Sequence, residues 1–495
     1  MKFNDSVEPE MRGEALSSIR LGEQMMKRCK SLYTLLPTAA IACGICAGSL
    51  PAGTVHAGAI AKPALVLGPA AVASDQVASN SFRLFTCQVG KVPGVNCYDP
   101  FEIRHAYGTD SLINAGWDGS GRTIVIIDAF QSPNIQTELG TFDNFYGLPA
   151  PQFTQIAPQG LTPFDSSSND QLGWAEEISL DVEWSHAIAP GANIVLVLSK
   201  SDQDADILAA TKYAVDNNLG DVISQSFGEN EACMDPSLLA QQHEVFAEAT
   251  RKGMTIFASS GDNGSGQPTC DGSSLVQAVS TPAVDPLVTA VGGTELHAAD
   301  YTTSDPGAYQ GEIVWNETGI GAGGGGFSLL YSEPSYQKGT LHGHGQLGVP
   351  DVSYNAAVEH GVLTFLDIPG LPVAFFLFGG TSAGSPQWSA ITAIADQKNG
   401  RDLGFINKAL YHIGQAPPHE SQSYHDVTDG NNSFAGIPGF SAGPGWDAAT
   451  GLGTPQAPGL VDLLLQLVSP GDGQSAIAQS AGASTSHGQG HMKAH

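Results

Sequence analysis

GRTIVIIDAF, residues 121–130, is an almost unbroken apolar run that is rich in β-branched residues and ends in an acid. A short run of this kind predicts a strand that is buried on both faces of a sheet. Similar strands are predicted at 192–199, 221–228, 253–264 and 287–293.

The segments between these strands have the periodicity of helices. Apolar residues recur three and four positions apart over 174–189, and acidic residues open a second helix over 201–218. A third helix is predicted over 236–252. Strands that alternate with helices of this length predict an α/β fold, a doubly wound parallel sheet with helices on both faces. In such sheets, ligands bind beyond the carboxyl ends of the strands.

The composition limits the classes of partner. The chain has 495 residues, enough for one large domain with extensions. Its 49 acidic and 20 basic side chains give a formal net charge of −29. Because phosphate binding needs clustered Lys and Arg, we expect no nucleic-acid partner. The charge alone fits a halophilic protein or a periplasmic binding protein equally well.

Residues 1–57 have the order of a secretory signal peptide, basic then apolar then small, after an atypically long polar extension. Lys27, Arg28 and Lys30 precede the apolar stretch 32–50, and residues 55–57 offer a cleavage site. A single membrane anchor is the alternative. We predict a secreted or periplasmic protein with no stable membrane association once the signal is removed.

The rest of the chain divides into three parts by composition. Residues 58–95 are rich in Ala, Val and Ser and are predicted to form a linker or a short pro-segment. The alternating α/β domain is predicted over 96–468. Residues 469–495 are of low complexity, and we predict that they are disordered.

Four cysteines lie beyond the predicted signal: Cys87, Cys97, Cys233 and Cys270. An even number in an exported chain indicates two disulfides. Three pairings are possible, and we favour Cys87–Cys97 with Cys233–Cys270.

FGGTSAGSPQW, residues 378–388, places Ser382 in a glycine-rich turn at the end of an apolar run. Such a serine is a candidate nucleophile, but it needs a neighbouring base to take its proton. No candidate histidine has an obvious carboxylate to orient it, which argues against a Ser-His-Asp site. The candidates are His186, His342, His344 and His360.

Carboxylic acids are better candidates for the base. Glu177 and Asp181 are four residues apart and therefore lie on one face of a helix. In a partly buried site such a pair shares a proton, and a carboxyl near its pKa acts as both base and acid in acidic solution. The alternative is an ordinary acidic helix face next to Glu176 and Glu183.

A succession of short motifs runs through the chain: EISLD, APGANIVLV, SQSFGE, SSGDNG, VTAVGGT, GGGGFS with PSYQ, PDVSYNA, GGTSAGSP, and YHDVTDG with GWDAATGLGTP. Together they cover roughly residues 98–466. In this order they resemble the sedolisins, the serine-carboxyl peptidases. The resemblance implies a subtilisin-like fold.

The resemblance also implies roles for four residues. Ser382 resembles the family nucleophile, Glu177 its general base and acid, and Asp181 the acid that backs the glutamate. Asp262, in SSGDNG, resembles the aspartic acid that donates to the oxyanion and must be protonated to do so. Its composition alone would make SGDNG a turn.

Other positions near the expected cleft are less distinctive. Asp128 stands where some relatives carry an acid coupled to the catalytic pair, and Phe227 stands where a tryptophan is common. Residues 225–228 are expected to pair with an extended peptide. The glycine-rich segment 321–328 either forms a wall of the cleft or is a plain flexible loop.

The resemblance further implies one structural Ca²⁺ near the C-terminus. Hard oxygen ligands suit this ion. The matching ligands are the side chains of Asp426 and Asp447 with the carbonyls of Val427, Gly443 and Gly445. Two Asx-turns are the alternative.

The predicted function is a secreted, acid-active serine-carboxyl endopeptidase that acts on protein or peptide substrates as a monomer. The alternatives are an inactive binding or surface protein that keeps the fold, and a tripeptidyl exopeptidase of the same family. Relatives usually carry a large pro-domain, whereas about 40 residues separate the predicted cleavage site from CYDP. We therefore expect a shortened pro-segment or folding without one.

Overall fold

The computed structural model describes residues 65–70, 72–78, 82–341, 343–469 and 471–484. The predicted signal peptide, His342 and residues 485–495 lie outside these ranges. No helix in the described part of the chain is long and apolar enough to cross a membrane. The predicted α/β fold is confirmed.

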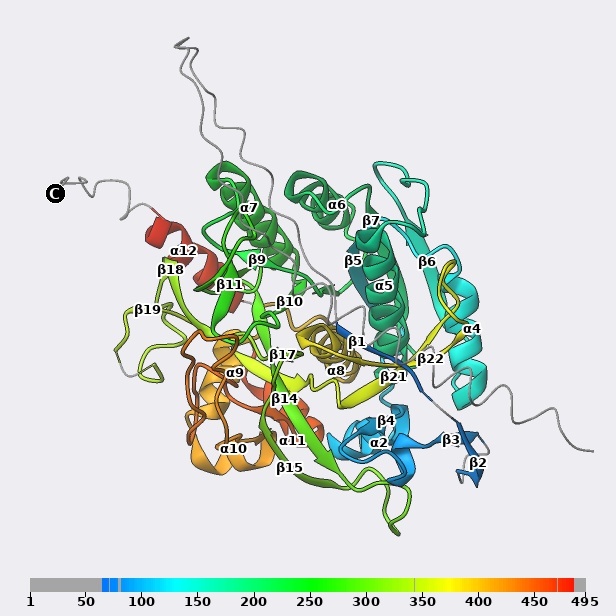
Figure 1. Cartoon of the computed structure of the whole chain (residues 1–495). Helices are drawn as coiled ribbons and strands as arrows, with labels where there is room; N and C mark the ends of the chain where they lie inside the picture. The colour runs from blue at the N-terminus through cyan, green and yellow to red at the C-terminus, as the bar shows by residue number, and fades with distance from the viewer. Residues whose placement is uncertain (1–64, 71, 79–81, 342, 470, 485–495) are drawn as a thin grey trace, which may run out of the picture. The chain divides into compact units, whose positions relative to one another are not determined.

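The main sheet has eight strands, in the order β15-β14-β10-β8-β5-β7-β6 with β20 paired to β14 (Figure 1). Every pairing is parallel except that of β14 with β15. Five of the strands were expected from apolar runs, whereas β6, β15 and β20 were not. The strands are β5 (Thr123–Ala129), β6 (Gln152–Ile156), β7 (Asn193–Ser199), β8 (Val222–Gln225), β10 (Thr255–Ser259), β14 (Thr289–Ala298), β15 (Tyr309–Val314) and β20 (Val352–Asn355).

Each face of this sheet is covered by a different pair of helices, α5 and α8 on one face and α6 and α7 on the other. In β5, Ile124 and Ile126 belong to the core of the first face, whereas Val125 and Ile127 belong to the core of the second. A strand between two cores must be apolar at every position, which explains the unbroken run. The helices are α5 (Asn169–Ile188), α6 (Asp204–Asp216), α7 (Pro236–Lys252) and α8 (Gly384–Asn399).

A smaller sheet has the order β1-β22-β21-β4. β1 pairs antiparallel with β22, the strand that leads into the Ser382 turn. Residues 58–95 therefore contain strands that belong to the domain, although their role as a linker or pro-segment stays a prediction. The elements here are β1 (Leu65–Pro69), β2 (Val72–Val77), β3 (Arg83–Phe85), the 3-10 helix η1 (Cys87–Val89), β4 (Asn96–Tyr98), β21 (His360–Leu366) and β22 (Ala374–Gly379).

Both favoured disulfides are confirmed. Cys87–Cys97 links η1 to β4, and Cys233–Cys270 links the loop before α7 to the loop after β11. The remaining elements are α2 (Pro100–Ala106), α3 (Thr109–Asn114), α4 (Ile135–Tyr146), α9 (Asn407–Gly414), α10 (Pro417–Ser423), α11 (Ala457–Leu467), α12 (Asp472–Ser484), η2 (Thr381–Ala383), β9 (Glu229–Asn230), β11 (Gly266–Pro268), β12 (Leu275–Gln277), β13 (Ser280–Thr281), β16 (Asn316–Glu317), β17 (Gly321–Ala322), β18 (Gly326–Ser332), β19 (Gln346–Val349), β23 (Tyr424–His425) and β24 (Thr454–Pro455).

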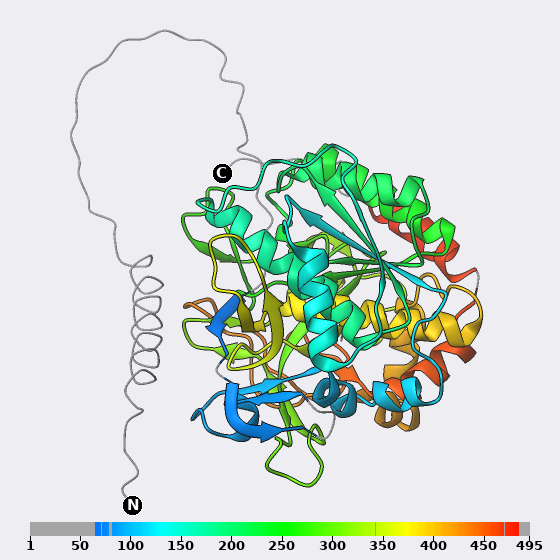
Figure 2. The same ribbon diagram turned by 90° about the vertical axis from the view of Figure 1, so that its right-hand side faces the viewer.

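The segment that follows residue 468 differs from the expectation of disorder, because α12 is a helix. Lys408 Nζ donates to Asp472 Oδ1 at 2.5 Å, and Ile477 packs against the core beneath α6 and α7. Figures 1 and 2 both show α12, in red, beside α7. Its alanines favour a helix, and composition alone does not reveal that an ion pair and the side chains of Ala476 and Ile477 attach it to the domain.

Candidate active site

The loops predicted to carry the chemistry meet at the carboxyl ends of the central parallel strands. Asp128 lies near the end of β5, Ser226 follows β8, and Asp262 lies three residues beyond β10. Ser382 lies in η2, which connects β22 to α8 and packs against α5, β10 and β14. This is the edge at which parallel sheets bind ligands.

The Ser382 turn is fixed by reciprocal hydrogen bonds to Ser226. Gly380 turns the chain out of β22 with a φ of 100°, which glycine adopts without strain. Ser382 Oγ then donates to the Ser226 carbonyl oxygen at 3.1 Å, and Ser226 Oγ donates to the Ser382 carbonyl oxygen at 3.3 Å. Ser382 is only 3% exposed. The candidate nucleophile is therefore held in one place by a hydrogen bond to a backbone carbonyl oxygen.

Three fully buried carboxylic acids belong to the same region. Glu177 and Asp181 lie on α5, one turn apart as their spacing predicts, and Asp128 lies on β5. The Asp181 carboxyl interacts with the side chains of Glu177 and Ser226, and Asp128 acts on it through its charge. Ser226 thus contacts both the acid pair and the Ser382 turn.

Burial dominates the electrostatics of these acids. It raises the pKa of Asp128 to about 8. It also raises the pKa of Asp181 well above its usual range, and the charge of Asp128 raises it further, while hydrogen bonds with Ser226 and Glu177 lower it. Neighbouring carboxylates removed from water cannot all be ionised, so the group retains protons above the ordinary pKa of an aspartic acid.

Asp262 is fixed by the residue that precedes Ser382. The backbone N–H and the Oγ1 of Thr381 both donate to Asp262 Oδ1 at 2.8 Å, and Gly261 N donates to Thr381 Oγ1 at 3.0 Å. Burial raises the pKa of Asp262, and the two hydrogen bonds from Thr381 partly offset it. A carboxyl that retains its proton beside a nucleophile can donate to a negative charge that forms there.

The histidines considered as bases lie elsewhere. His186 lies near the C-terminal end of α5, its Nε2 is 2.7 Å from a backbone carbonyl oxygen, and burial lowers its pKa to about 4. His344 stacks on an aromatic ring, and His360 lies against another histidine. Within the described residues, no hydrogen bond joins an imidazole to Ser382.

The glycine-rich segment 321–328 is closely packed against the loop that carries Asp262. Gly324 N donates to the Gly261 carbonyl oxygen, and Ser260 Oγ donates to the Gly324 carbonyl oxygen, both at 2.7 Å. A Cβ on Gly324 would lie 2.2 Å from the Ser260 carbonyl oxygen, so no other residue fits. This packing favours a wall over a flexible loop.

A hollow of about 190 Å³ lies beside this wall. It is bounded by both apolar and polar side chains, and the loop after Asp262 contributes Ser265 to it. The lining residues include Ser265, Gln277, Gly326, Phe327, Leu329 and Phe440.

Known proteins are similar to the part of the chain that contains the Ser382 turn and the buried acids. Residues 174–404 match the model of the Subtilase family. Kumamolisin of Bacillus sp. (strain MN-32) is 34% identical over 380 residues, which are 74% of this chain and 64% of kumamolisin. Sedolisin of Pseudomonas sp. (strain 101) is 35% identical over 374 residues, which are 72% of this chain and 59% of that protein.

A solved structure extends this similarity to three dimensions. Pseudomonas sedolisin, a serine-carboxyl proteinase complexed with two molecules of pseudo-iodotyrostatin, superimposes with a TM-score of 0.64 and 29% identity. The match covers 76% of this chain and 100% of that one. The described domain belongs to the sedolisin family.

The chain spans about three fifths of the length of the curated relatives that it matches, 64% of kumamolisin and 59% of the Pseudomonas protein. A further relative is tripeptidyl-peptidase 1 of Rattus norvegicus, which is 30% identical over 58% of this chain and 52% of its own length. The subtilisin-like fold implied by the motifs is confirmed.

Two residues of the site were not singled out from the sedolisin motifs. Ser226 and Thr381 lie inside SQSFGE and GGTSAGSP. Their importance comes from contacts between distant loops, which a short motif does not display. Phe227, at the position where a tryptophan is common, is buried with its ring 5.9 Å from that of Trp174.

The loop predicted to hold calcium brings two carboxylates to one glycine-rich turn. Gly445 N donates to Asp426 Oδ2, and Gly443 N donates to Asp447 Oδ2, both at 3.0 Å. Asp447 Oδ1 also accepts from two backbone N–H groups at 2.9 Å, which is the Asx-turn of the alternative. Two carboxylates beside one glycine-rich turn supply oxygen ligands of the kind that suits a hard cation.

Proposed function

We propose that this protein is a serine-carboxyl peptidase that is active in acid and cleaves internal peptide bonds of protein or peptide substrates. One observation supports this proposal most directly. Ser226 bonds both to the Ser382 turn and to the buried carboxyl of Asp181, which also interacts with Glu177 and Asp128, and within the described chain Ser382 is bonded to no imidazole. Membership of the sedolisin family supports the same reaction class.

In this proposal, Ser382 Oγ attacks the carbonyl carbon of the peptide bond while Glu177 accepts the hydroxyl proton. Asp181, one helical turn away, shares that proton with Glu177 and limits the change in charge inside a buried site. Glu177 then gives the proton to the leaving amine as the C–N bond breaks, which leaves an acyl group on Ser382. A water molecule then attacks the ester carbonyl while Glu177 accepts a proton from the water. Glu177 finally gives this proton to Ser382 Oγ as the bond between the acyl group and Ser382 breaks.

Asp262 acts on the carbonyl oxygen in the same steps. As a neutral acid it donates a hydrogen bond to the oxyanion, whereas an ionised Asp262 would repel it. The raised pKa of Asp262 and its fixed position next to Ser382 support this role. The same requirement for protonated acids explains why the activity is expected in acidic solution.

The substrate is proposed to lie across the carboxyl edge of the sheet. Residues 225–228, where the chain leaves β8, are proposed to pair with an extended peptide. The hollow lined by Phe327 and Phe440 is proposed to receive an apolar substrate side chain. Leu329, which is 61% exposed at its rim, adds apolar surface for the same purpose.

The direct test is peptide hydrolysis measured from about pH 3 to about pH 8 for the wild type and for Ser382→Ala. We expect wild-type activity to be highest in acid and the variant to lose roughly 10³-fold or more in kcat at every active pH. Equal activities would instead favour the alternative of a binding protein that keeps the fold without catalysis.

A tripeptidyl exopeptidase is the second candidate, and the similarity to rat tripeptidyl-peptidase 1 favours it. The masses of the products from one long peptide distinguish the two modes. Internal fragments at early times indicate an endopeptidase, whereas successive tripeptides from the N-terminus indicate the exopeptidase.

We further propose that the protein is exported, acts as a monomer and holds one structural Ca²⁺. Two disulfides support an oxidising compartment. Asp426 and Asp447, with the carbonyls of Val427, Gly443 and Gly445, would hold the ion, which would supply positive charge between two carboxylates. None of these residues belongs to the Ser382 site, so the ion would act on stability.

A further inference from the structure

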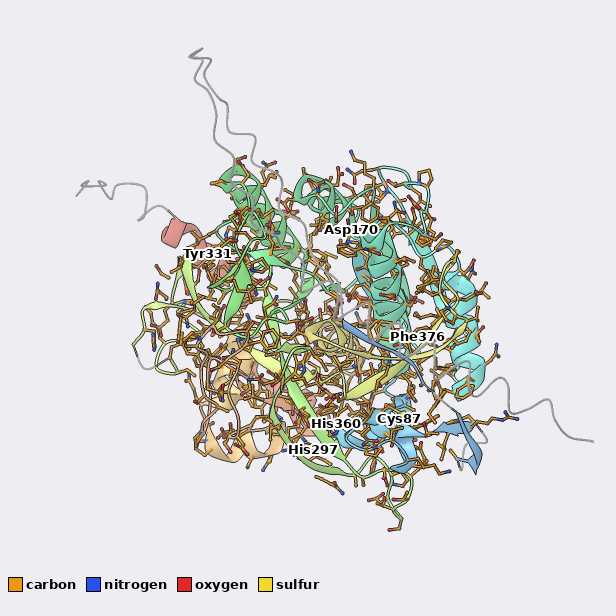
Figure 3. All side chains as sticks on the ribbon, in the orientation of Figure 1. Cys87, Asp170, His297, Tyr331, His360 and Phe376 are labelled. Atoms are coloured by element: carbon orange, nitrogen blue, oxygen red, sulfur yellow. A yellow bond between two sulfur atoms is a disulfide. The ribbon has the colours of Figure 1, made fainter. Side chains whose placement is uncertain are left out.

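Glu295, His297 and His360 form a cluster away from the Ser382 turn. Glu295 and His297 are two residues apart on β14 of the main sheet, so their side chains lie on the same side of that strand. His360 is the first residue of β21, which belongs to the smaller sheet. Figure 3 shows His297 and His360 next to each other, and their ring centroids are 5.0 Å apart.

The donor atoms of this cluster have the spacing of metal ligands. Glu295 Oε1 lies 3.2 Å from His360 Nδ1 and 3.5 Å from His297 Nε2. All three donor atoms lie within 4.8 Å of one another. Two ligands at about 2.0–2.1 Å from a tetrahedral Zn²⁺ are roughly 3.3 Å apart, so little movement is needed to place an ion between these atoms.

The environment also fits a ligand set better than a simple ion pair. His360 Nδ1 is buried and makes no hydrogen bond among the described residues, although Glu295 is close. The planes of the two imidazole rings meet at an angle of 85°, and one nitrogen of each ring lies within 3.5 Å of the same carboxylate oxygen. The side chain of His297 is 42% exposed, so an ion can enter from solvent.

We propose that Glu295, His297 and His360 bind one divalent transition-metal ion of the Zn²⁺ class, with water completing the coordination. Two imidazoles and one carboxylate select such ions over Ca²⁺ and Mg²⁺, which prefer oxygen ligands. This site is therefore chemically distinct from the loop of Asp426 and Asp447.

The ion acts as a link between the two sheets. β14 belongs to the main sheet, and β21 pairs with β22, which leads to Ser382, and with β4, which carries a disulfide. β21 is also joined to α5, because Trp184 Nε1 donates to the Leu363 carbonyl oxygen at 3.2 Å and Phe365 N donates to Glu183 at 2.8 Å. Metal binding between the sheets should raise the unfolding temperature.

The test uses the full chain in a Ser382→Ala background, which prevents self-cleavage and makes the readout independent of activity. His487, His491 and His495 are replaced by Gln in every protein compared, because histidines of the C-terminal segment would also bind metal. Zn²⁺ is titrated calorimetrically at about pH 7.5, where imidazole is neutral, with excess Ca²⁺ present to saturate oxygen sites.

We expect one equivalent of Zn²⁺ to bind with a Kd of about 10 µM or tighter and to raise Tm by a few degrees. Co²⁺ in place of Zn²⁺ should give a visible absorption band of a site with nitrogen ligands. His297→Gln should weaken Zn²⁺ binding at least about tenfold and remove the Tm increase. His412→Gln, a change of an exposed histidine on α9, is the matched control and should bind like the parent.

The proposal is overturned if the parent shows no stoichiometric Zn²⁺ binding, or if His297→Gln and the control bind Zn²⁺ with the same affinity. Thermal unfolding without metal establishes that the variants are folded. Glu295→Gln, which keeps the side-chain shape, gives a second variant with the same expected loss in case His297→Gln does not fold.

Discussion

The chain has two sets of paired acids in very different surroundings. Glu177, Asp181 and Asp128 are fully buried, and Asp181 interacts with both of the others and with Ser226, which holds the Ser382 turn. Asp426 and Asp447 lie on a glycine-rich loop, where Asp426 is exposed and Asp447 is half-buried. Each of these two carboxylates accepts a hydrogen bond from a backbone N–H of the same turn.

The difference determines what neutralises each set. Burial is the leading cause of the raised pKa of Asp181, and the nearby Asp128 raises it further, so protons must balance this charge. Burial raises the pKa of Asp447 as well, and hydrogen bonds from the backbone and from Thr450 lower it. Because Asp447 is only half-buried, whereas Asp181 is fully buried, a cation from solvent can reach its carboxylate. Residues of the same type thus suit proton transfer in one place and calcium binding in the other.

Replacing Glu177 should have the largest effect and tests the first half of this contrast. Glu177→Gln keeps the side-chain shape but cannot accept a proton, so we expect kcat to fall by roughly 10²–10⁴-fold. Steady-state kinetics on a peptide substrate at the acidic optimum measure the change.

Glu176→Gln is the matched control for that experiment. Glu176 is the preceding residue of α5, lies about 100° around the helix from Glu177, and also has a pKa that burial raises, to about 7. We expect it to retain near-normal kcat. Similar losses in both variants would mean that the acidity of this helix face, and not a specific base, supports activity.

Removing calcium should have an intermediate effect and tests the second half of the contrast. A chelator should lower Tm by about 5–10 °C in the wild type, because an ion that binds only the folded state stabilises it. Differential scanning calorimetry with and without Ca²⁺ gives the shift.

Asp447→Asn should start at the lower Tm and no longer respond to chelator. Asp429→Asn, an exposed change on the same loop, should respond like the wild type. If the chelator does not change the Tm of the wild type, the loop holds no calcium, and the alternative of two Asx-turns is correct.

The sequence predicts the parts of the molecule that depend on local periodicity or on a short motif. The run around Ile124 predicts a doubly buried strand, and the spacing of Glu177 and Asp181 predicts their shared helix face. It does not predict the partly exposed edge strand β6, whose burial pattern is irregular. Nor does it predict the pairing of Ser226 with Ser382 or the approach of His297 to His360, because these contacts join segments that only the folded topology brings together.

The pH dependence of stability should show the smallest effect, and it tests the burial of the acids of the candidate site without any substrate. Burial raises the pKa of Asp128 in the folded protein to about 8, whereas an unfolded aspartic acid has a pKa of about 3.9. Between pH values of about 3.9 and about 8, the folded state therefore keeps a proton that the unfolded state has released. The contribution to stability is complete below about pH 4 and is lost as the pH rises through about 8, with a slope near −1.4 kcal/mol per pH unit for each such proton.

Urea unfolding at intervals between about pH 5 and pH 8 measures this slope. Asp128→Asn removes one titrating group, so its free energy of unfolding should fall less steeply with pH than that of the wild type. Burial lowers the pKa of His186 to about 4, so below its ordinary pKa of about 6.5 this residue makes the free energy of unfolding rise with pH. His186 is present in both proteins and therefore does not affect the comparison. Parallel pH profiles for the two proteins would show that Asp128 is ionised in the folded state. The distinction between acids neutralised by protons and acids neutralised by a cation would then fail at a fully buried acid.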